Sequence, residues 1–360
     1  MSVIFKVEAS SGPYEVQIGT RLHEKSTKES PFSIIDALVA KLWVKSVPQD
    51  AFLVQAIEQN KTLETSAQII EAMRSKGVQR GSHLQAFGGG IIQDLSTITA
   101  SLYMRGIEWT YYPTTLLGMV DSCIGGKSSI NVGRYKNIAG NFYPPKEIII
   151  NVEFCETLAL SEQVAGLCEA IKICYAAKTD SFDQYIKNFS GISLPLSSEQ
   201  LLGLVELSLL TKKTFIEEDE FDQGPRLLLN FGHTIGHAIE AATHFSITHG
   251  VAVGMGMLAE IRIGMLLNKY SELPERANLL DSYIRGLLKN IPDMVNTISN
   301  LDLTLALEAF KSDKKHTNQS YVIVALDQQG YLERVSIPVS DDSNGIILEI
   351  FEWVKKDFLL

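Results

Sequence analysis

Residues 230–250 read NFGHTIGHAIEAATHFSITHG, and this stretch indicates how the second half of the chain folds. Four of its residues are histidines, although the whole chain of 360 residues has only 7. The run 231–242 has helix-forming residues and no proline, so we expect a helix there. His233 and His237 then lie four positions apart on one face, about 5–6 Å apart at Cβ. A glycine precedes each of them and leaves room for another group to approach that face.

The same stretch contains a candidate metal site. His249 follows a polar turn and precedes a second expected helix, which begins at Val251. Two imidazoles on one helix and a third from the next element suit a metal such as Zn2+. The alternative is a pair of ordinary helix histidines without a ligand, because motif spacing alone produces false positives.

Length and composition limit the classes of protein to which this chain can belong. A chain of 360 residues is long enough for two domains with a core in each. No apolar run approaches the ~18–20 residues of a membrane span, and the start lacks the pattern of a signal peptide. The four cysteines form no CxxC pair, which predicts buried free thiols and a cytoplasmic protein. The formal net charge of −10 argues against nucleic acid or a membrane as partner, while local Lys and Arg still permit a small anionic substrate.

Hydrophobic patterns divide the chain near Glu153. Up to that point strands alternate with helices such as 63–76, which is typical of an α/β layer. The expected strands are 3–9, 14–18, 32–35, 52–55, 83–88, 108–113 and 148–152. The later part is mainly helical, with expected helices at 161–177, 198–217, 231–242, 251–268, 274–289 and 303–310, and a hairpin of strands 321–325 and 331–337. We therefore predict an α/β domain over 1–152 and a mainly helical domain over 153–360, with a site at their interface.

Two earlier segments are candidates for ligand binding. The loop 88–90 consists of three glycines between a strand and a helix, so its backbone N–H groups can hold a pyrophosphate. It does not match GxGxxG, and a simple tight turn explains it equally well. The segment 112–143 carries isolated polar residues that are individually typical of solvated loops. With Arg105 they form a set able to bind carboxylate and phosphate: Asp121, Lys127, Lys136 and Asn137.

Other candidates lie on or near the helices of the second half. Glu169 and Lys172 are three positions apart and suit an ordinary surface ion pair. A carboxylate is nevertheless the usual missing ligand beside two histidines. Three polar residues precede the histidine helix, namely Lys212, Arg226 and Asn230. A basic patch near the C-terminus consists of Lys311, Lys314 and Lys315, and its simpler interpretation is a solvated helix end.

Together these motifs resemble the 3-dehydroquinate synthase family, within the sugar phosphate cyclases. The resemblance runs in register from about Glu58 to Lys315. It is carried by EQNKTLET, GGGIIQDL, YMRG, PTTLLGMVDSCIGGK, KNIAGNFYPPK, LCEAIK, RLLLNFGHTIGHAIE, THG and SDKK. It implies a Rossmann-like NAD-binding α/β domain followed by a mainly helical domain, with the site between them. It also implies bound NAD+, one divalent metal (Zn2+, or Co2+ as an alternative), a small sugar phosphate substrate and a homodimer.

The resemblance assigns roles by position. The metal ligands would be Glu169, His233 and His249, and His237 would instead lie near the substrate phosphate. NAD+ would be held by Asp36, Glu58, Lys61, Gly89, Gly90, Ile91, Asp94, Thr114, Thr115, Phe154, Thr157, Leu158 and Glu162. The substrate would meet catalytic and binding residues, namely Arg105, Asp121, Lys127, Lys136, Asn137, Lys172, Lys212, Arg226, Asn230, His237 and either Lys314 or Lys315.

The implied reaction converts 3-deoxy-D-arabino-heptulosonate 7-phosphate to 3-dehydroquinate and phosphate. Three departures from the family pattern bear on the substrate: Leu38 where Asn is usual, Val251 where Glu follows HG, and Asp222 where Glu is frequent. The alternatives are a paralogous cyclase acting on sedoheptulose 7-phosphate, a metal-dependent alcohol dehydrogenase, and a catalytically silent NAD- or metal-binding regulator. A zinc peptidase is a poor alternative, because the chain contains no HExxH motif.

Overall fold

A computed structural model of the chain describes residues 3–22, 32–133, 135–268 and 271–357. Contacts between residues group the chain into two units, neither of which is continuous in sequence. The first unit comprises Met1–Leu158 and Pro195–Gln223, and the second comprises Ala159–Leu194 and Gly224–Leu360. Helix α6 (Ser198–Glu218) therefore groups with the first unit. The boundary predicted from the sequence, between 152 and 153, places this helix in the second domain.

The first unit is built on a seven-stranded sheet with the order β1-β2-β9-β6-β5-β3-β4. Its strands are β1 (Val3–Val7), β2 (Tyr14–Gly19), β3 (Phe32–Asp36), β4 (Phe52–Val54), β5 (His83–Gly88), β6 (Glu108–Pro113) and β9 (Glu147–Asn151). Only β1 and β2 pair antiparallel; the other neighbouring pairs are parallel. Strand β5, in the interior of this sheet, is buried along its whole length, as expected where helices cover a parallel sheet.

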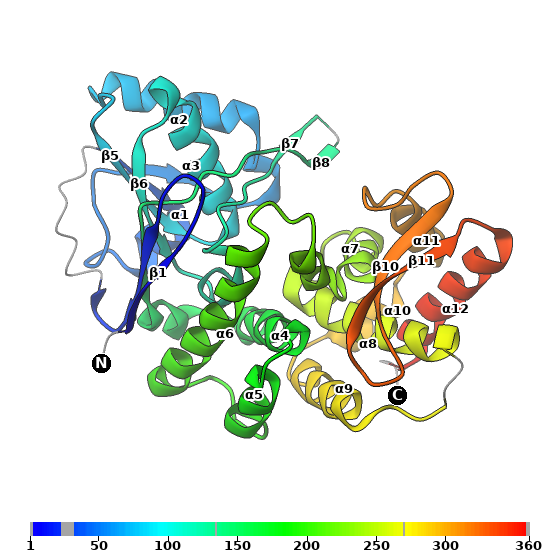
Figure 1. Ribbon diagram of the computed structural model, residues 1–360. Coiled ribbons are helices and arrows are strands. Elements are labelled where there is room, and N and C mark those ends of the chain that lie inside the picture. The colour runs from blue at the N-terminus through cyan, green and yellow to red at the C-terminus, as the bar shows by residue number, and fades with distance from the viewer. Residues whose placement is uncertain (1–2, 23–31, 134, 269–270, 358–360) are drawn as a thin grey trace. The chain divides into compact units, whose positions relative to one another are not determined.

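Helices and a small hairpin complete this unit (Figure 1). Helix α3 packs against β3, β5 and β6, and α6 packs against β1 and β2, which explains why α6 belongs here. The other elements are α1 (Ala37–Leu42), η2 (Glu58–Asn60), α2 (Leu63–Ser75), α3 (Gly90–Leu102), η3 (Tyr103–Arg105), η4 (Gly118–Ser122), η5 (Val152–Thr157) and the hairpin strands β7 (Ile130–Val132) and β8 (Tyr135–Ala139).

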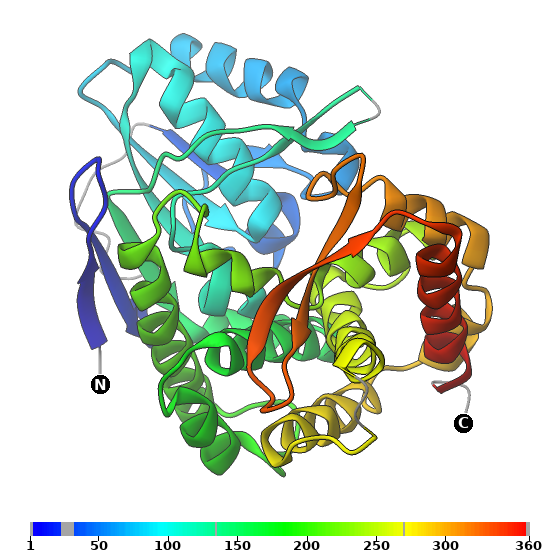
Figure 2. The ribbon, with the colours of Figure 1, turned by 45° about the vertical axis from the view of Figure 1, so that its right-hand side comes forward.

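The second unit is mainly helical and surrounds helix α8 (His249–Asn268), which contacts α4, α7, α9, α12 and β10. Figure 2 shows its hairpin of β10 and β11 passing over the helices. The remaining elements are α4 (Leu160–Ala176), α5 (Ser181–Phe189), η6 (Pro225–Asn230), α7 (His233–Ala242), α9 (Glu275–Leu288), α10 (Met294–Ser299), α11 (Leu303–Lys311), β10 (Ser320–Leu326), β11 (Leu332–Pro338) and α12 (Asp341–Asp357).

Helix α8 is the core of this unit. Among the described residues it is the one helix whose length and composition would allow it to cross a membrane, and 78% of its most apolar window is buried inside the protein. It begins at His249, two residues earlier than expected. The Ala252 N–H donates to the Thr248 carbonyl at 3.0 Å, so the first helical turn includes His249.

Helices α7 and α8 approach each other through glycines. A Cβ atom on Gly256 would lie 2.0 Å from the Gly232 carbonyl oxygen, and one on Gly236 would lie 2.9 Å from that of Ala252. The sequence suggested that the glycines beside the histidines leave room for another group. In the structure, the group that occupies this space is the backbone of α8.

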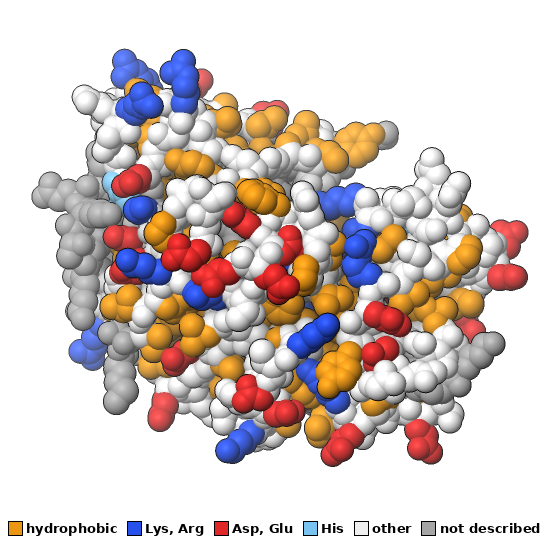
Figure 3. Space-filling view, in the orientation of Figure 1, with side chains coloured by type: hydrophobic (Ala, Val, Ile, Leu, Met, Phe, Trp, Pro, Cys, Tyr) orange, Lys and Arg blue, Asp and Glu red, His pale blue; other side chains and the backbone are white. Residues whose placement is uncertain are grey.

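The surface of the molecule carries mixed charges. On the face shown in Figure 3, acidic and basic side chains are interspersed, with hydrophobic side chains between them. Several large apolar side chains are exposed in the segment 38–63 of the first unit, which includes the edge strand β4. They are Leu38, Leu42, Val44, Leu53, Ile57 and Leu63.

Candidate functional site

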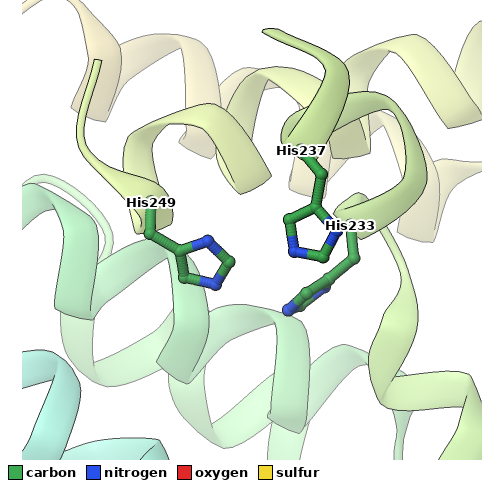
Figure 4. Close-up of side chains that lie close together, drawn as sticks. All are labelled: His233, His237 and His249. Atoms are coloured by element: carbon green, nitrogen blue, oxygen red, sulfur yellow. The ribbon is translucent and has the colours of Figure 1, made fainter. Parts of the chain in front are cut away.

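Three histidines of the second unit converge on one point. His233 and His237 project from α7, and His249 is the first residue of α8 (Figure 4). One ring nitrogen from each residue lies within 4.8 Å of the other two. The spacing of four on α7 therefore places both imidazoles on one face, and the start of α8 supplies the third, as the sequence predicted.

Glu169 of α4 reaches the same point. Its Oε1 atom lies 3.5 Å from His249 Nε2 and 3.8 Å from His233 Nε2, while Oε2 pairs with Lys172 Nζ. Glu169 is 0% and Lys172 2% exposed, so the interpretation of this pair as an ordinary surface ion pair is wrong. Almost every residue of α4 is buried, and a carboxylate in such a helix requires a charged partner.

Hydrogen bonds at Nδ1 hold the rings of His233 and His249 with their Nε2 atoms toward Glu169. His233 Nδ1 lies 3.2 Å from the Phe231 carbonyl oxygen, and His249 Nδ1 lies 3.1 Å from Glu240 Oε2. An Nδ1–H donated to an oxygen leaves the Nε2 lone pair available, which is the usual arrangement behind a metal-binding histidine.

Electrostatics favours neutral imidazoles on α7. Burial, followed by the charges of Lys172 and His249, lowers the pKa of His233 well below its usual value. Desolvation by the surrounding protein, then the charges of His249 and Lys315, lower the pKa of His237 to about 4. Burial also lowers the pKa of His249, but the hydrogen bond and charge of Glu240 outweigh it, so the net shift is upward.

The donor set suits a divalent metal. A tetrahedral ion with bonds of about 2.0–2.2 Å holds its ligand atoms roughly 3–4 Å apart, and the Glu169–His249 and Glu169–His233 separations of 3.5 and 3.8 Å fall in that range. Two sets share His233 and His249: one adds Glu169, as the family resemblance implies, and the other adds His237. The first set remains our prediction.

Further predicted residues belong to the second unit. Arg226 is 3% exposed at η6, and the Asn230 amide donates to the Leu227 carbonyl at 3.0 Å. Lys315 pairs with Asp313 at 2.8 Å, and its charge acts on His233 and His237, whereas Lys314 is exposed. Of the two lysines, the structure therefore favours Lys315. Glu162 lies in the first turn of α4 and so belongs to this unit.

In the first unit, the glycine loop connects β5 to α3. Gly89 is the N-cap residue of α3, and a Cβ atom there would lie 2.9 Å from the Thr115 side chain. A Cβ atom on Gly90 would have no protein atom within 4 Å, so the N-terminus of α3 is open. An open helix N-terminus without an acidic residue in its first turn suits a pyrophosphate. Ile91 occupies the next position, and the Thr114 N–H donates to the Gly88 carbonyl at 3.0 Å.

The other predicted NAD+ residues of this unit lie at the ends of several elements. Asp36 caps α1 by accepting from the Leu38 N–H at 3.0 Å. Burial raises the pKa of Asp36, against the lowering effect of that bond. Lys61 pairs with Asp94 at 2.7 Å. At η5, Thr157 accepts from the Trp43 indole at 3.1 Å, the Phe154 ring contacts Trp43, and Leu158 follows.

The predicted substrate residues of the first unit are paired with carboxylates or lie on strained backbone. Lys212 is 6% exposed and pairs with Asp121 at 2.6 Å. Lys127 pairs with Asp222, so the shorter acid in place of the usual Glu still meets a cation. Lys136 lies 3.5 Å from Glu58. Arg105 and Asn137 have φ angles of +69° and +52°, in the left-handed region that non-glycine residues seldom adopt.

Sequence reasoning missed Glu240 and Glu260. Glu240 lies on the face of α7 that carries His233 and His237, seven and three positions away, and this spacing could have identified it. Glu260 of α8 accepts from the Gly232 N–H at 2.6 Å, directly before His233. Burial raises the pKa of Glu260 to about 8, although the bond from Gly232 lowers it. Nothing in the local sequence distinguishes Glu260 from an exposed helix residue.

Comparison with known families gives two adjacent matches. Residues 51–165 match the family described as 3-dehydroquinate synthase N-terminal, and residues 166–316 match 3-dehydroquinate synthase C-terminal. The chain belongs to the 3-dehydroquinate synthase family. The 3-dehydroquinate synthase of Sulfolobus acidocaldarius is 37% identical over 287 residues, 78% of this chain and 79% of the relative. That of Alkaliphilus metalliredigens is 35% identical over 286 residues, 77% of this chain and 76% of the relative.

Solved structures support the fold expected of a 3-dehydroquinate synthase family member. A 2-deoxy-scyllo-inosose synthase, solved with carbaglucose-6-phosphate, NAD+ and Co2+, has a TM-score of 0.78 at 22% identity, covering 97% of this chain and 99% of that one. The 2-epi-5-epi-valiolone synthase of Streptomyces hygroscopicus, with NAD+ and Zn2+, has a TM-score of 0.75 at 23% identity, covering 94% and 97%. The predicted fold class and family are therefore confirmed, and the chain is an enzyme of the cyclase type.

Proposed function

We propose that this enzyme converts 3-deoxy-D-arabino-heptulosonate 7-phosphate to 3-dehydroquinate and phosphate, with NAD+ and one divalent metal. The observation that carries the proposal is the convergence of Glu169, His233 and His249 in a chain that is 37% identical to a 3-dehydroquinate synthase over 78% of its length. The open start of α3 at Gly90 supports a dinucleotide in the first unit.

The protein's contribution would be mainly binding and orientation. When bound, the metal would polarise substrate hydroxyls while NAD+ accepts and later returns a hydride. Lys172, fixed by Glu169, would direct an ammonium group toward the substrate beside the metal ligands. Arg226 and Lys315 would hold anionic groups of the substrate. His237 is neutral near pH 7 because its pKa is about 4, so it would donate or accept one hydrogen bond without adding charge.

The number of cations supports a substrate with both a phosphate and a carboxylate. Arg105, Lys127, Arg226 and Lys315 are all predicted to meet the substrate, which is more cations than one phosphate requires, although Lys127 and Lys315 also pair with Asp222 and Asp313. We expect kcat/KM for the heptulosonate phosphate to exceed that for sedoheptulose 7-phosphate at least about tenfold, the size of one lost charged hydrogen bond. Phosphate release with NAD+ and Zn2+, measured for both substrates, tests this. Equal or faster turnover of sedoheptulose 7-phosphate would assign the chain to a paralogous activity.

One observation favours that second activity. Val251 stands where the family motif has an acidic residue, and it is 2% exposed in the first turn of α8, two positions after His249. A buried apolar residue there changes the charge near the proposed metal. The substrate comparison decides between the two activities without affecting the proposed metal and NAD+ sites.

We further propose a cytoplasmic homodimer. The exposed apolar residues of segment 38–63 support a second copy as the partner, because large exposed apolar patches commonly mark association sites. Light scattering of the purified protein would measure the oligomeric state, and a monomer at micromolar concentration would contradict this proposal.

A further inference from the structure

Asn131 of β7 connects two groups of predicted site residues in the first unit. Its amide nitrogen donates to Glu58 Oε1 at 2.9 Å and to the Glu58 carbonyl oxygen at 3.2 Å. Its backbone N–H donates to the Lys61 carbonyl at 2.8 Å. Asn131 therefore binds the short segment that carries two of the predicted NAD+ residues, and at 9% exposure it is buried.

The other end of the same side chain binds the neighbouring strand. Asn131 Oδ1 accepts from the backbone N–H of Asn137 at 2.9 Å. Asn137 has φ +52°, and a hydrogen bond to its N–H helps to hold that unfavourable conformation. Asn137 and its neighbour Lys136 are predicted to act on the substrate.

A second set of contacts closes the connection. Asn137 Oδ1 accepts from Lys61 Nζ at 2.7 Å and from the Ser129 hydroxyl at 2.9 Å. Lys61 also pairs with Asp94 at 2.7 Å, and Asp94 accepts from the Ser129 N–H at 3.0 Å. The proposed dinucleotide residues and Asn137 thus belong to one hydrogen-bonded network.

Glu58 links the network to Lys136. Its Oε1 atom accepts from the Asn131 amide at 2.9 Å and lies 3.5 Å from Lys136 Nζ. A ligand that takes a hydrogen bond from Lys61 or gives one to Glu58 would change the bonds made by Asn131, Lys136 and Asn137. The rigid side-chain amide of Asn131 bonds both to Glu58 and to the Asn137 N–H. A shift of one of these segments is therefore transmitted to the other.

We propose that Asn131 is a positioning residue that couples dinucleotide binding to the placement of Lys136 and Asn137 on β8. This inference rests on the proposed function, since it takes NAD+ as the ligand of the Glu58–Lys61 segment. In this proposal Asn131 acts through its bonds to Glu58 and to the Asn137 N–H. Its role is to make the substrate-binding strand adopt its working conformation when the cofactor is present.

The two ends of the amide can be separated by substitution. Asn131→Asp keeps an acceptor for the Asn137 N–H but replaces the donor to Glu58 with a like charge. Asn131→Ala removes both ends. Ile138→Ala is the matched control, because Ile138 lies on β8 next to Asn137 and is 62% exposed.

NAD+ affinity, steady-state kinetics and hydrogen exchange of residues 130–139 test the coupling in the full-length, metal-loaded enzyme. We expect NAD+ to slow exchange over this segment in the wild type and in Ile138→Ala. In Asn131→Ala that protection should be lost even at saturating NAD+, with kcat reduced at least about tenfold, the size of one or two lost hydrogen bonds. Asn131→Asp should weaken NAD+ binding about tenfold yet retain most of kcat at saturating NAD+.

The outcomes separate this inference from the proposed function. If the wild type binds no NAD+, both fail. If it binds NAD+ but Asn131→Ala keeps the protection, or Ile138→Ala loses it equally, the positioning role alone is refuted. Should Asn131→Ala not fold, the split between NAD+ affinity and kcat in Asn131→Asp still decides: equal losses in both, or no loss in either, would overturn the coupling.

Discussion

The Nε2 atoms of His233 and His249 lie 3.8 and 3.5 Å from Glu169 Oε1, whereas the ring of His237 contacts the rings of the other two histidines. We therefore expect His233→Ala to lose bound metal and activity, and His237→Ala to lose activity while keeping the metal. Metal content of the dialysed variants, measured by atomic emission, checks this. Equal metal loss in both variants would favour the three-histidine set.

Glu240 is the second residue to test at this scale. Its carboxylate orients His249 by accepting from Nδ1 at 3.1 Å. Glu240→Gln retains the shape but removes the charge, and we expect metal affinity to fall about 10–100-fold, the usual effect of removing such a partner. Competition with a chelator measures the affinity. Glu275→Gln, at the exposed start of α9, is the control and should leave the affinity unchanged.

Sequence spacing predicted the three histidines of the cluster but not the residues that hydrogen-bond or pair with them. The four-residue spacing on α7 sufficed for His233 and His237, because helix geometry fixes which side chains share a face. It failed for the Glu169–Lys172 pair, since α4 is buried on nearly all sides and periodicity cannot reveal that. The bond between Glu240 and His249 depends on how α7 and α8 cross, which only tertiary structure determines.

Among the elements, the contact between α7 and α8 should tolerate substitution least. Gly256→Ala would place a methyl group 2.0 Å from the Gly232 carbonyl, so the helices must separate. We expect the free energy of unfolding to fall by about 1–3 kcal/mol or more, the usual cost of overpacking. Gly286→Ala on α9 meets no atom within 4 Å and should stabilise the protein by about 0.5–1 kcal/mol. Urea denaturation of both variants measures the difference, and equal stabilities would contradict it.

The hydrogen bond between Glu260 of α8 and the Gly232 N–H, directly before α7, should make stability depend on pH. The pKa of Glu260 rises from 4.5 to about 8 on folding, mainly because the side chain is buried. The folded state therefore favours protonated Glu260. The stability that this protonation contributes is fully present below pH about 4.5, the ordinary pKa, and is lost as pH rises through about 8, the pKa in the folded state. For chelator-treated protein we expect unfolding free energy to fall between pH about 4.5 and about 8, and Glu260→Gln to flatten that slope. An unchanged slope in Glu260→Gln would refute this assignment.

Elements with strong patterns and clear boundaries were predictable from the sequence. Strands β5 and β6 occupy the expected ranges, because each is a largely buried segment that ends at Gly88 or Pro113. Strands β7 and β8 were missed, since β8 is exposed over most of its length and has no apolar alternation. Helices α1, α5, α10 and α12 were also missed.

For the whole molecule, the decisive behaviour is whether the cofactor is consumed. A cyclase that returns its hydride needs NAD+ only in catalytic amounts, whereas a dehydrogenase accumulates NADH. We expect many turnovers of phosphate release per NAD+ and no lasting absorbance of NADH. Stoichiometric NADH, followed in the same reaction, would instead indicate a dehydrogenase.

The order of strands and helices was enough to predict a two-part α/β and helical molecule. It did not reveal that the segment 195–223 returns to the first unit. The sequence of helix α6 does not indicate which part of the molecule it completes, and its contacts with β1 and β2 show it.

This return of the chain has a consequence during protein synthesis. The first unit requires Pro195–Gln223, so its sheet cannot be fully covered when the ribosome has added residue 158. At about 5–20 residues per second, several seconds pass before α6 emerges. During that interval the nascent strands β1 and β2 lack the helix that packs on them, so chaperone binding should be strongest on chains arrested between residues 158 and 223.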